Sequence, residues 1–200
     1  MTAALSLARI PEHTIDPLFH ERWSPRAFTA EEISVETLMG LFEAARWAPS
    51  ANNAQPWRFV YARRGAPAFE KLLATLAPGN QLWAGKASAL VAVVSLELMA
   101  VPGKPDLVPS ASHSFDAGAA WAQLALQAHL WGWSTHAMGG FDRAKAGEAL
   151  SIPPAHHVEV FVAIGRRGDA SALPDWARAR EKPNERRPLA ELVREGSFAP

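Results

Sequence analysis

Residues 114–131, which read SFDAGAAWAQLALQAHLW, form the strongest helical pattern in the chain and the element around which the rest is arranged. Ser114 is a possible N-cap, and Asp116 lies in the first turn, where the helix dipole favours an acidic side chain. We expect the helix to end near Gly132. Its small residues permit close packing against another element; these are Ala117, Gly118, Ala120 and Ala125.

Strand patterns lie on both sides of this helix. Residues 87–96 (ASALVAVVSL) form a nearly continuous apolar run, which is typical of a strand buried on both faces. Residues 57–62 (WRFVYA) are rich in aromatic and β-branched types, which favours a strand. Residues 133–138 predict a short strand after the helix, and residues 157–165 (HVEVFVAIG) predict the last core strand. The chain therefore has about four core strands.

Shorter helices separate the strands. Residues 34–47 place Leu38, Leu41 and Ala45 on one helical face, with Ser34 as a cap and Pro49 preventing simple continuation. Residues 67–76 predict a helix that starts at a proline, and residues 142–150 predict another. Residues 98–112 hold three prolines and a glycine, so we expect a loop.

Helices interleaved with about four strands indicate an α+β or mixed α/β layer fold. The length of 200 residues suits one domain, 1–200. Within it, residues 1–16 form a loose N-terminal lead-in. Residues 166–200, rich in Pro, Arg and Glu, form an extended tail that we expect to lie over a surface rather than to build its own core.

Composition excludes several functions. Twenty basic and twenty acidic residues give a formal charge of zero, so no global field favours nucleic acid or an acidic membrane. The absence of cysteine excludes disulfides, thiolate catalysis and iron–sulfur clusters, and no histidine spacing predicts a metal site. There is no membrane-length apolar run, and the first residues make a poor signal peptide, which is compatible with a cytoplasmic protein.

Two polar segments could carry chemistry in the first third of the chain. Residues 21–28 (ERWSPRAF) place Arg22, Ser24 and Arg26 within five residues, and Pro25 favours extended backbone. Such a segment can bind one phosphate, although a solvated basic turn is the alternative. Residues 49–57 (PSANNAQPW) offer amide donors and acceptors suited to a flat heterocycle, or else a simple helix-to-strand connection.

Two more candidate segments lie in the second half. Residues 139–142 (GGFD) bring two glycines before a helix start, where backbone can approach a ligand, although a tight turn is the commoner explanation. Residues 184–189 (NERRPL) form a second basic cluster, which would complete an anion site only if it converged with Arg22 and Arg26. Neither a dinucleotide-binding glycine motif, a phosphate-binding P-loop nor a hydrolase nucleophile elbow is present.

These four segments together, in this order, resemble the FMN-dependent nitroreductase family, and the likeness extends from Arg22 to Val193. Asn53-Ala54-Gln55-Pro56-Trp57 is the most specific block, whereas each other block is weak alone. The resemblance implies an α+β fold with a central mixed, mainly antiparallel sheet flanked by helices, built as an interlocked homodimer with an extended C-terminal tail. It also implies non-covalent FMN bound at the subunit interface.

The resemblance assigns roles to residues of this chain. Arg22, Ser24 and Arg26 would bind the FMN phosphate and ribityl end, joined by Arg186 and Arg187. The backbone N–H groups of Gly139 and Gly140 would lie near flavin N5. The remaining cofactor-binding positions are Trp23 and Pro49 within the matched blocks, Ser50 and Ala51 from the partner chain, Asn53 and Gln55 along the flavin ring, and Asn80 near its pyrimidine side.

The implied activity is reduction of nitroaromatic, quinone or related acceptors by NADH or NADPH, through alternating reduction and oxidation of bound FMN. Since the flavin carries the hydride, no side chain is expected to act as a nucleophile. Two alternatives stay open: another reductase chemistry on enones, aldehydes or halogenated compounds, and a flavin carrier or regulator without turnover. Ala51 stands where the family often has Ser, and the short segment 98–112 suggests an open pocket. No residue that reads a ribose phosphate is identifiable, so the sequence does not choose between NADH and NADPH.

Overall fold

The centre of the protein is a four-stranded sheet in the order β1-β2-β6-β5. A computed structural model describes residues 9–198 and gives β1 as Trp57–Arg63, β2 as Ala89–Leu96, β5 as Ser134–Met138 and β6 as His156–Gly165. All three pairings are antiparallel. The predicted α+β class with a mainly antiparallel sheet is confirmed, and β5 is left as an edge strand.

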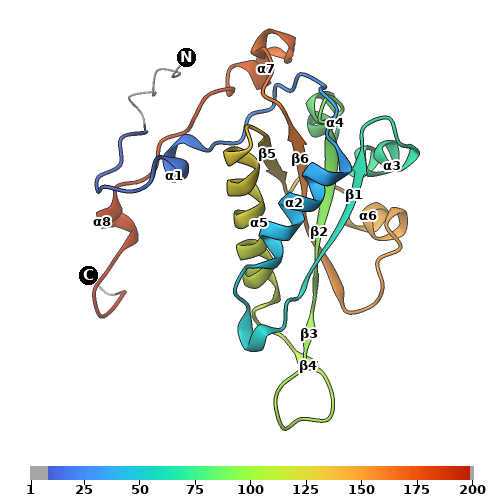
Figure 1. Cartoon of the computed structure of the whole chain (residues 1–200), viewed down its shortest axis with the longest axis vertical. Helices are drawn as coiled ribbons and strands as arrows, with labels where there is room; N and C mark the ends of the chain where they lie inside the picture. Colours follow the sequence, from blue (N-terminus) through green and yellow to red (C-terminus); the bar gives the residue numbers. More distant parts are fainter. Residues whose placement is uncertain (1–8, 199–200) are drawn as a thin grey trace.

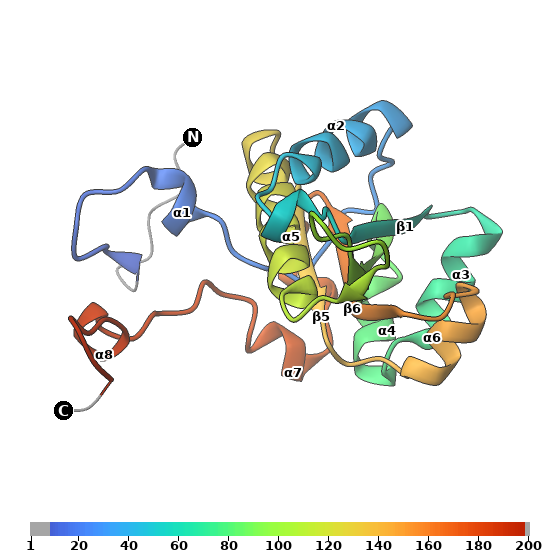
Figure 2. The same cartoon turned by 90° about the horizontal axis from the view of Figure 1, so that it is seen from below.

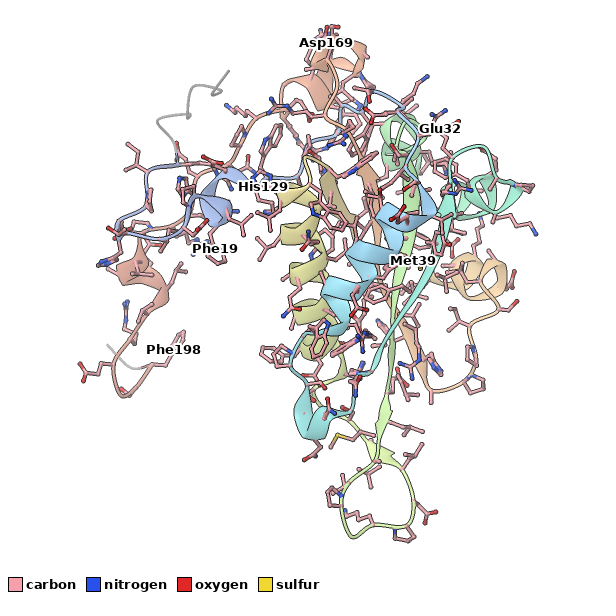
Figure 3. The ribbon with its side chains drawn as sticks, in the orientation of Figure 1. Phe19, Glu32, Met39, His129, Asp169 and Phe198 are labelled. Atoms are coloured by element: carbon pink, nitrogen blue, oxygen red, sulfur yellow. The ribbon has the colours of Figure 1, made fainter. Side chains whose placement is uncertain are left out.

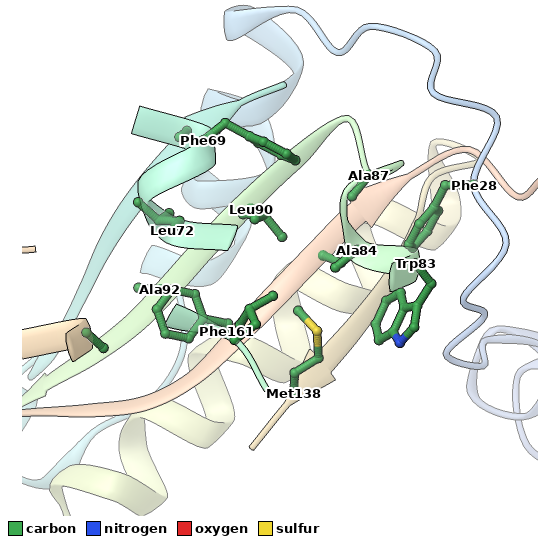
Figure 4. Packing of buried hydrophobic residues seen from close by; sticks show 14 of the residues in the cluster. Phe28, Phe69, Leu72, Trp83, Ala84, Ala87, Leu90, Ala92, Met138 and Phe161 are labelled. Carbon is green, nitrogen blue, oxygen red and sulfur yellow. The ribbon is translucent and has the colours of Figure 1, made fainter. Parts of the chain in front are cut away.

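The sheet is buried on both faces because β2 is apolar at almost every position. Leu90 and Ala92 contribute to one core cluster, whereas Val91 and Val93 contribute to the other, as the alternation of side chains along a strand requires. Figure 4 shows the first cluster, in which Phe161 of β6 lies among residues of β2 and the helices that cover it.

Helices cover each face. The face bearing Val91 and Val93 packs against α2 (Val35–Arg46) and α5 (His113–Leu130). The opposite face is covered by α3 (Pro67–Thr75), α4 (Pro78–Ala84) and α6 (Arg143–Ala149). Figures 1 and 2 show these two helical layers with the sheet between them.

Local sequence patterns predicted the start of one helix correctly and that of another incorrectly. Ser34 caps α2 as predicted, because its side chain accepts a hydrogen bond from the N–H of Thr37 at 3.0 Å. Ser114 does not cap α5, which begins one residue earlier; its hydroxyl donates instead to Glu159 at 2.7 Å. Helix α4 was not predicted, because its seven residues are too few to show a helical period.

The expected loop 98–112 contains a small hairpin. Strands β3 (Leu98–Met99) and β4 (Val108–Pro109) pair antiparallel, so the loop prediction is wrong at these four positions. Strands of two residues are too short to show an alternating pattern, and the three prolines of this segment favoured a loop. Between α2 and β1 lies the short 3-10 helix η2 (Ala51–Asn53).

The two ends of the chain run together beside the main body. On the N-terminal side is α1 (Pro17–Glu21), and the tail holds η3 (Ala170–Ala172), α7 (Asp175–Arg178) and α8 (Leu189–Leu192). Figures 1 and 2 show α1 and α8 close to each other and away from the sheet. The tail is thus mainly extended, with short helical turns, and residues 1–8 of the expected lead-in lie outside the described part.

Candidate functional site

A basic pocket of about 170 Å³ lies where the N-terminal segment meets the C-terminal tail. Six of its ten lining residues are arginine or lysine, and none is acidic. We call it the arginine pocket; it is lined by Arg9, Arg22, Trp23, Ser24, Arg26, His136, Arg180, Lys182, Asn184 and Arg186. The structure therefore brings together the two basic clusters that sequence reasoning could only suppose to converge.

The segment carrying Ser24 and Arg26 is held in place from its backbone. The N–H groups of Arg26 and Ala27 both donate to the carboxylate of Glu181, each at 2.9 Å. The N–H of Thr29 donates to the carbonyl of Arg166, and that of Gly168 to the carbonyl of Ala27. Because the backbone carries these contacts, the Arg26 side chain is left available for a ligand.

The arginines repel one another. Burial, followed by the neighbouring charge of Arg186, lowers the pKa of Arg22. The pKa of Arg9 is lowered by burial and then by Arg186 and Arg22. Burial lowers the pKa of Arg26 as well, against a partial opposing effect of Glu181. Since no acidic residue lines the pocket, an external anion is the charge that would relieve this repulsion.

His136 joins the pocket to the edge strand β5, and sequence reasoning missed it. Its Nδ1 lies 3.1 Å from the carbonyl oxygen of Pro25, and its ring centroid lies 4.7 Å from that of Trp83. Burial and then the charge of Arg26 lower the pKa of His136 to about 4. The imidazole is therefore neutral near pH 7, with Nδ1–H donating to Pro25, which leaves Nε2 as an acceptor.

We predict that His136 makes the cofactor-free protein acid-sensitive. Its pKa in the folded state lies below the ordinary value of 6.5, so the unfolded state takes up the proton first as the pH falls. His136 therefore does not affect the free energy of unfolding above about pH 6.5 and lowers it as the pH falls towards 4. In His136→Asn, the decrease in this free energy between pH 7.5 and 4.5 should be smaller by roughly 2 kcal/mol. Urea unfolding of both proteins at pH 7.5 and at pH 4.5 measures this difference in the free energy of unfolding. An equal effect of His13→Asn, at an exposed position, would contradict the assignment.

The predicted glycine pair lies farther along the same sheet edge. Gly139 follows β5 three residues after His136, a separation of about 10 Å in extended backbone. The carbonyl of Gly140 accepts hydrogen bonds from the Asn80 side chain at 3.0 Å and from the N–H of Ala77 at 2.9 Å. At Gly139, no other atom lies within 4 Å of where a Cβ would be. Open space therefore adjoins this backbone.

The segment from Pro49 to Gln55 lies elsewhere in the chain. The N–H of Ala51 donates to Asp116 in the first turn of α5 at 3.2 Å, whereas residues around Arg22 adjoin His129 near the last turn. The thirteen residues from Asp116 to His129 correspond to about 20 Å of helix. Figure 3 shows His129 at the end of α5 nearest the N-terminal segment. One chain therefore does not bring this segment to the arginine pocket.

This segment is internally compact and strained. The N–H of Gln55 donates to Ser50 Oγ at 3.0 Å, and the Gln55 side chain donates to the carbonyl of Asn53 at 3.2 Å. Asn52, Asn53 and Gln55 have φ values of 50°, 53° and 48°, which are unfavourable for residues with side chains. Such strain is concentrated at functional sites. Asn53 and Gln55 are both exposed, so their amides can meet a second molecule.

The tail explains which C-terminal residues line the arginine pocket. Arg180, Lys182, Asn184 and Arg186 all do so, at every second position. The backbone turns at Arg180 and Lys182 and has no regular structure from 183 to 188, where Arg187 lies outside the pocket and beside Ile10 and Leu189. The basic residues Arg180 and Lys182 had a detectable signal, since they lie at even spacings of six and four residues before Arg186.

The sheet, its two helical layers and the arginine pocket at the β5 edge define an α+β protein with a basic pocket beside its sheet. The model of the nitroreductase family matches residues 20–166, so the chain belongs to the nitroreductase family. A crystal structure described as an oxidoreductase containing FMN is 46% identical, with a TM-score of 0.92, and the match covers 100% of this chain and 99% of that one.

Two further relatives are more distant. A protein of Rhodopseudomonas palustris (strain TIE-1), provisionally named an NADH dehydrogenase/NAD(P)H nitroreductase, is 28% identical over 82% of this chain and 90% of its own length. A provisionally named nitroreductase of Desulfovibrio desulfuricans, solved in complex with FMN, is 26% identical with a TM-score of 0.71, covering 93% of this chain and 100% of that one. Among residues 9–198, no helix is long and apolar enough to span a membrane.

Proposed function

We propose that this protein is an FMN-dependent oxidoreductase that uses NADH or NADPH to reduce nitroaromatic, quinone or related acceptors. The observation that carries the proposal is the arginine pocket, which lies on the same sheet edge as the open backbone at Gly139. A phosphate at one end and a flat ring system at the other match the two parts of FMN. The FMN-containing relative at 46% identity supports the same cofactor.

The residues of the pocket fit the phosphate end. Arg22, Arg26 and Arg186 supply guanidinium donors, and Ser24 supplies a hydroxyl group 3.4 Å from Arg22 Nη1. Arginine forks bind phosphate with two parallel hydrogen bonds, which are stronger than neutral ones. Within the described residues, the side chain of Arg26 makes no hydrogen bond and its guanidinium carbon lies 5.9 Å from the centroid of the Trp83 ring, so binding a phosphate there breaks no hydrogen bond.

The residues at the other end fit a flavin ring. The N–H groups of Gly139 and Gly140 donate to no described residue outside the sheet pairing, and the missing side chain of Gly139 allows close approach. Asn80 is held beside them by its bond to Gly140. FMN, when bound, supplies the hydride-transfer chemistry. Around it, these backbone donors and the Asn80 amide would orient the ring and stabilise negative charge on it.

The visible spectrum of the purified protein tests this function. We expect flavin absorption bands that bleach when NADH or NADPH is added without oxygen, and that return when a nitroaromatic or quinone is added. A yellow protein that neither donor bleaches would instead be a flavin carrier. A colourless protein that fails to bind added FMN would overturn the proposal.

We also propose that the site is shared between two copies of the chain. The segment from Pro49 to Gln55 lies about one helix length away from the arginine pocket of its own chain. A two-fold dimer could place this segment of one protomer beside the arginine pocket of the other. Because Ser50, Asn53 and Gln55 are joined by hydrogen bonds, they would come together from the partner. This differs from the sequence prediction, which assigned only Ser50 and Ala51 to the partner.

Mixing two defective variants tests the shared site. One variant carries Arg22→Ala and Arg26→Ala, and the other carries Asn53→Ala and Gln55→Ala. A heterodimer isolated with two different tags would contain one intact site, so we expect about one FMN per heterodimer and much less in either parent. If each site belonged to a single chain, the heterodimer would hold no more FMN than the parents.

A further inference from the structure

The arginine pocket holds more positive charge than one FMN phosphate needs. Six arginine or lysine side chains line it without a lining carboxylate. A phosphate monoester carries a charge of about −1.5 to −2 near neutral pH. Arg22, Arg26 and Arg186, with Ser24, already form a complete phosphate site in the proposed function. Arg9, Arg180 and Lys182 therefore represent an excess.

Two of these three residues are placed for a transient ligand. Arg180 and Lys182 are exposed, and within the described residues their side chains form no hydrogen bond or ion pair. Arg9 is different, because its guanidinium donates to the carbonyls of His20, Arg22 and Asn184. Arg9 thus joins the two ends of the chain. Arg180 and Lys182 remain available to bind a ligand, and we call these two exposed residues the rim of the pocket.

The position of the rim is fixed by Glu181, which lies between the two residues in sequence. Its carboxylate accepts the N–H groups of Arg26 and Ala27 and does not line the pocket. The backbone turns here, because the N–H of Arg180 donates to the carbonyl of Ala177 and that of Lys182 to the carbonyl of Arg180, and both side chains line the pocket. The rim cations are therefore held beside the cofactor site, and the negative charge of Glu181 is satisfied by backbone donors.

We infer that Arg180 and Lys182 attract the 2′-phosphate of the nicotinamide dinucleotide, so that the protein prefers NADPH to NADH. This inference rests on the proposed function. NADPH differs from NADH by one further phosphate group, with about −1.5 to −2 of charge. A basic rim beside the site accelerates the encounter with the more highly charged donor, and salt weakens the effect because the Debye length falls to about 8 Å at physiological ionic strength.

Steady-state kinetics of the FMN-saturated protein test the inference. For the native chain we expect kcat/KM to be about tenfold or more higher with NADPH than with NADH at low ionic strength, and the ratio to fall as salt is added. Arg180→Gln with Lys182→Gln should bring the ratio near one, mainly by raising the KM for NADPH. The FMN dissociation constant should change by less than about twofold, because the three arginines that bind the phosphate remain.

Arg63→Gln with Lys71→Gln, which removes two exposed charges from β1 and α3, is the matched control and should leave the ratio unchanged. A ratio near one in the native chain would overturn the inference, as would a ratio unaffected by the double substitution of Arg180 and Lys182. Loss of FMN binding in that double variant with an unchanged ratio would assign both cations to the cofactor and also overturn it. If neither donor bleached the bound flavin, the proposed function itself would fail.

Discussion

Replacing Arg22 and Arg26 together by alanine is expected to weaken FMN binding by two to four orders of magnitude. Each arginine would lose charge-assisted hydrogen bonds to the phosphate, worth about 1.5–3 kcal/mol apiece. Titration of cofactor-free protein with FMN, followed by quenching of flavin fluorescence, gives the two dissociation constants directly. The effect is large because both side chains line the pocket, and hydrogen bonds from a guanidinium to a phosphate are stronger than neutral ones.

The same two substitutions, which weaken FMN binding, are not expected to lower the thermal stability of the protein without FMN. Burial and like charge lower the pKa of Arg22, and burial lowers that of Arg26, which means that the charged forms are unfavourable there. Removing them should leave the melting temperature of the cofactor-free protein unchanged or higher. The opposite signs separate loss of a ligand contact from damage to the fold.

A second pair of substitutions controls for the loss of two positive charges. Arg63→Ala with Lys71→Ala removes two exposed positive charges from β1 and α3, on the other side of the sheet from β5. This control should leave the FMN dissociation constant within about twofold. If the arginine pair and the control had the same effect, net charge would explain the result and the phosphate assignment would be wrong.

Phe161→Ala is expected to destabilise the protein by about 3–5 kcal/mol, through lost burial and the cavity left behind. Phe161 has an exposure of 0% in the middle of β6, and its ring meets that of Phe141 edge-on at 5.0 Å. Phe141 directly follows the glycine pair. The substitution should therefore also loosen the backbone beside the proposed flavin ring, and FMN should be bound more weakly as well.

Urea unfolding measures the stability change, and the chain supplies its own control. Phe198 is 97% exposed near the end of the tail (Figure 3), so Phe198→Ala should change the free energy of unfolding by less than about 0.5 kcal/mol. Phe161→Leu, which keeps most of the volume, should cost less than about 1.5 kcal/mol. Comparable losses in all three variants would show that the sheet does not depend on Phe161.

Much of the fold could be predicted from sequence because its signals are local. The apolar run of β2 and the helical period of α2 and α5 appear within windows of ten to twenty residues. Ser34 capped its helix because an N-cap needs only the next three residues. Helix α4 and the β3–β4 hairpin were not predicted because they are too short for a repeated pattern of apolar residues to be recognised.

The candidate site likewise has features that the sequence predicts and features that only the structure shows. The residue patterns alone predicted an α+β or mixed α/β fold and the polar segments around Arg22, Asn53, Gly139 and Arg186, because these signals lie in adjacent residues. Only the tertiary structure decided that Arg186 rather than Arg187 faces the pocket, since this depends on the direction of an extended tail. The roles of His136 and Glu181 depend on contacts across more than a hundred residues, and no local pattern can encode such contacts.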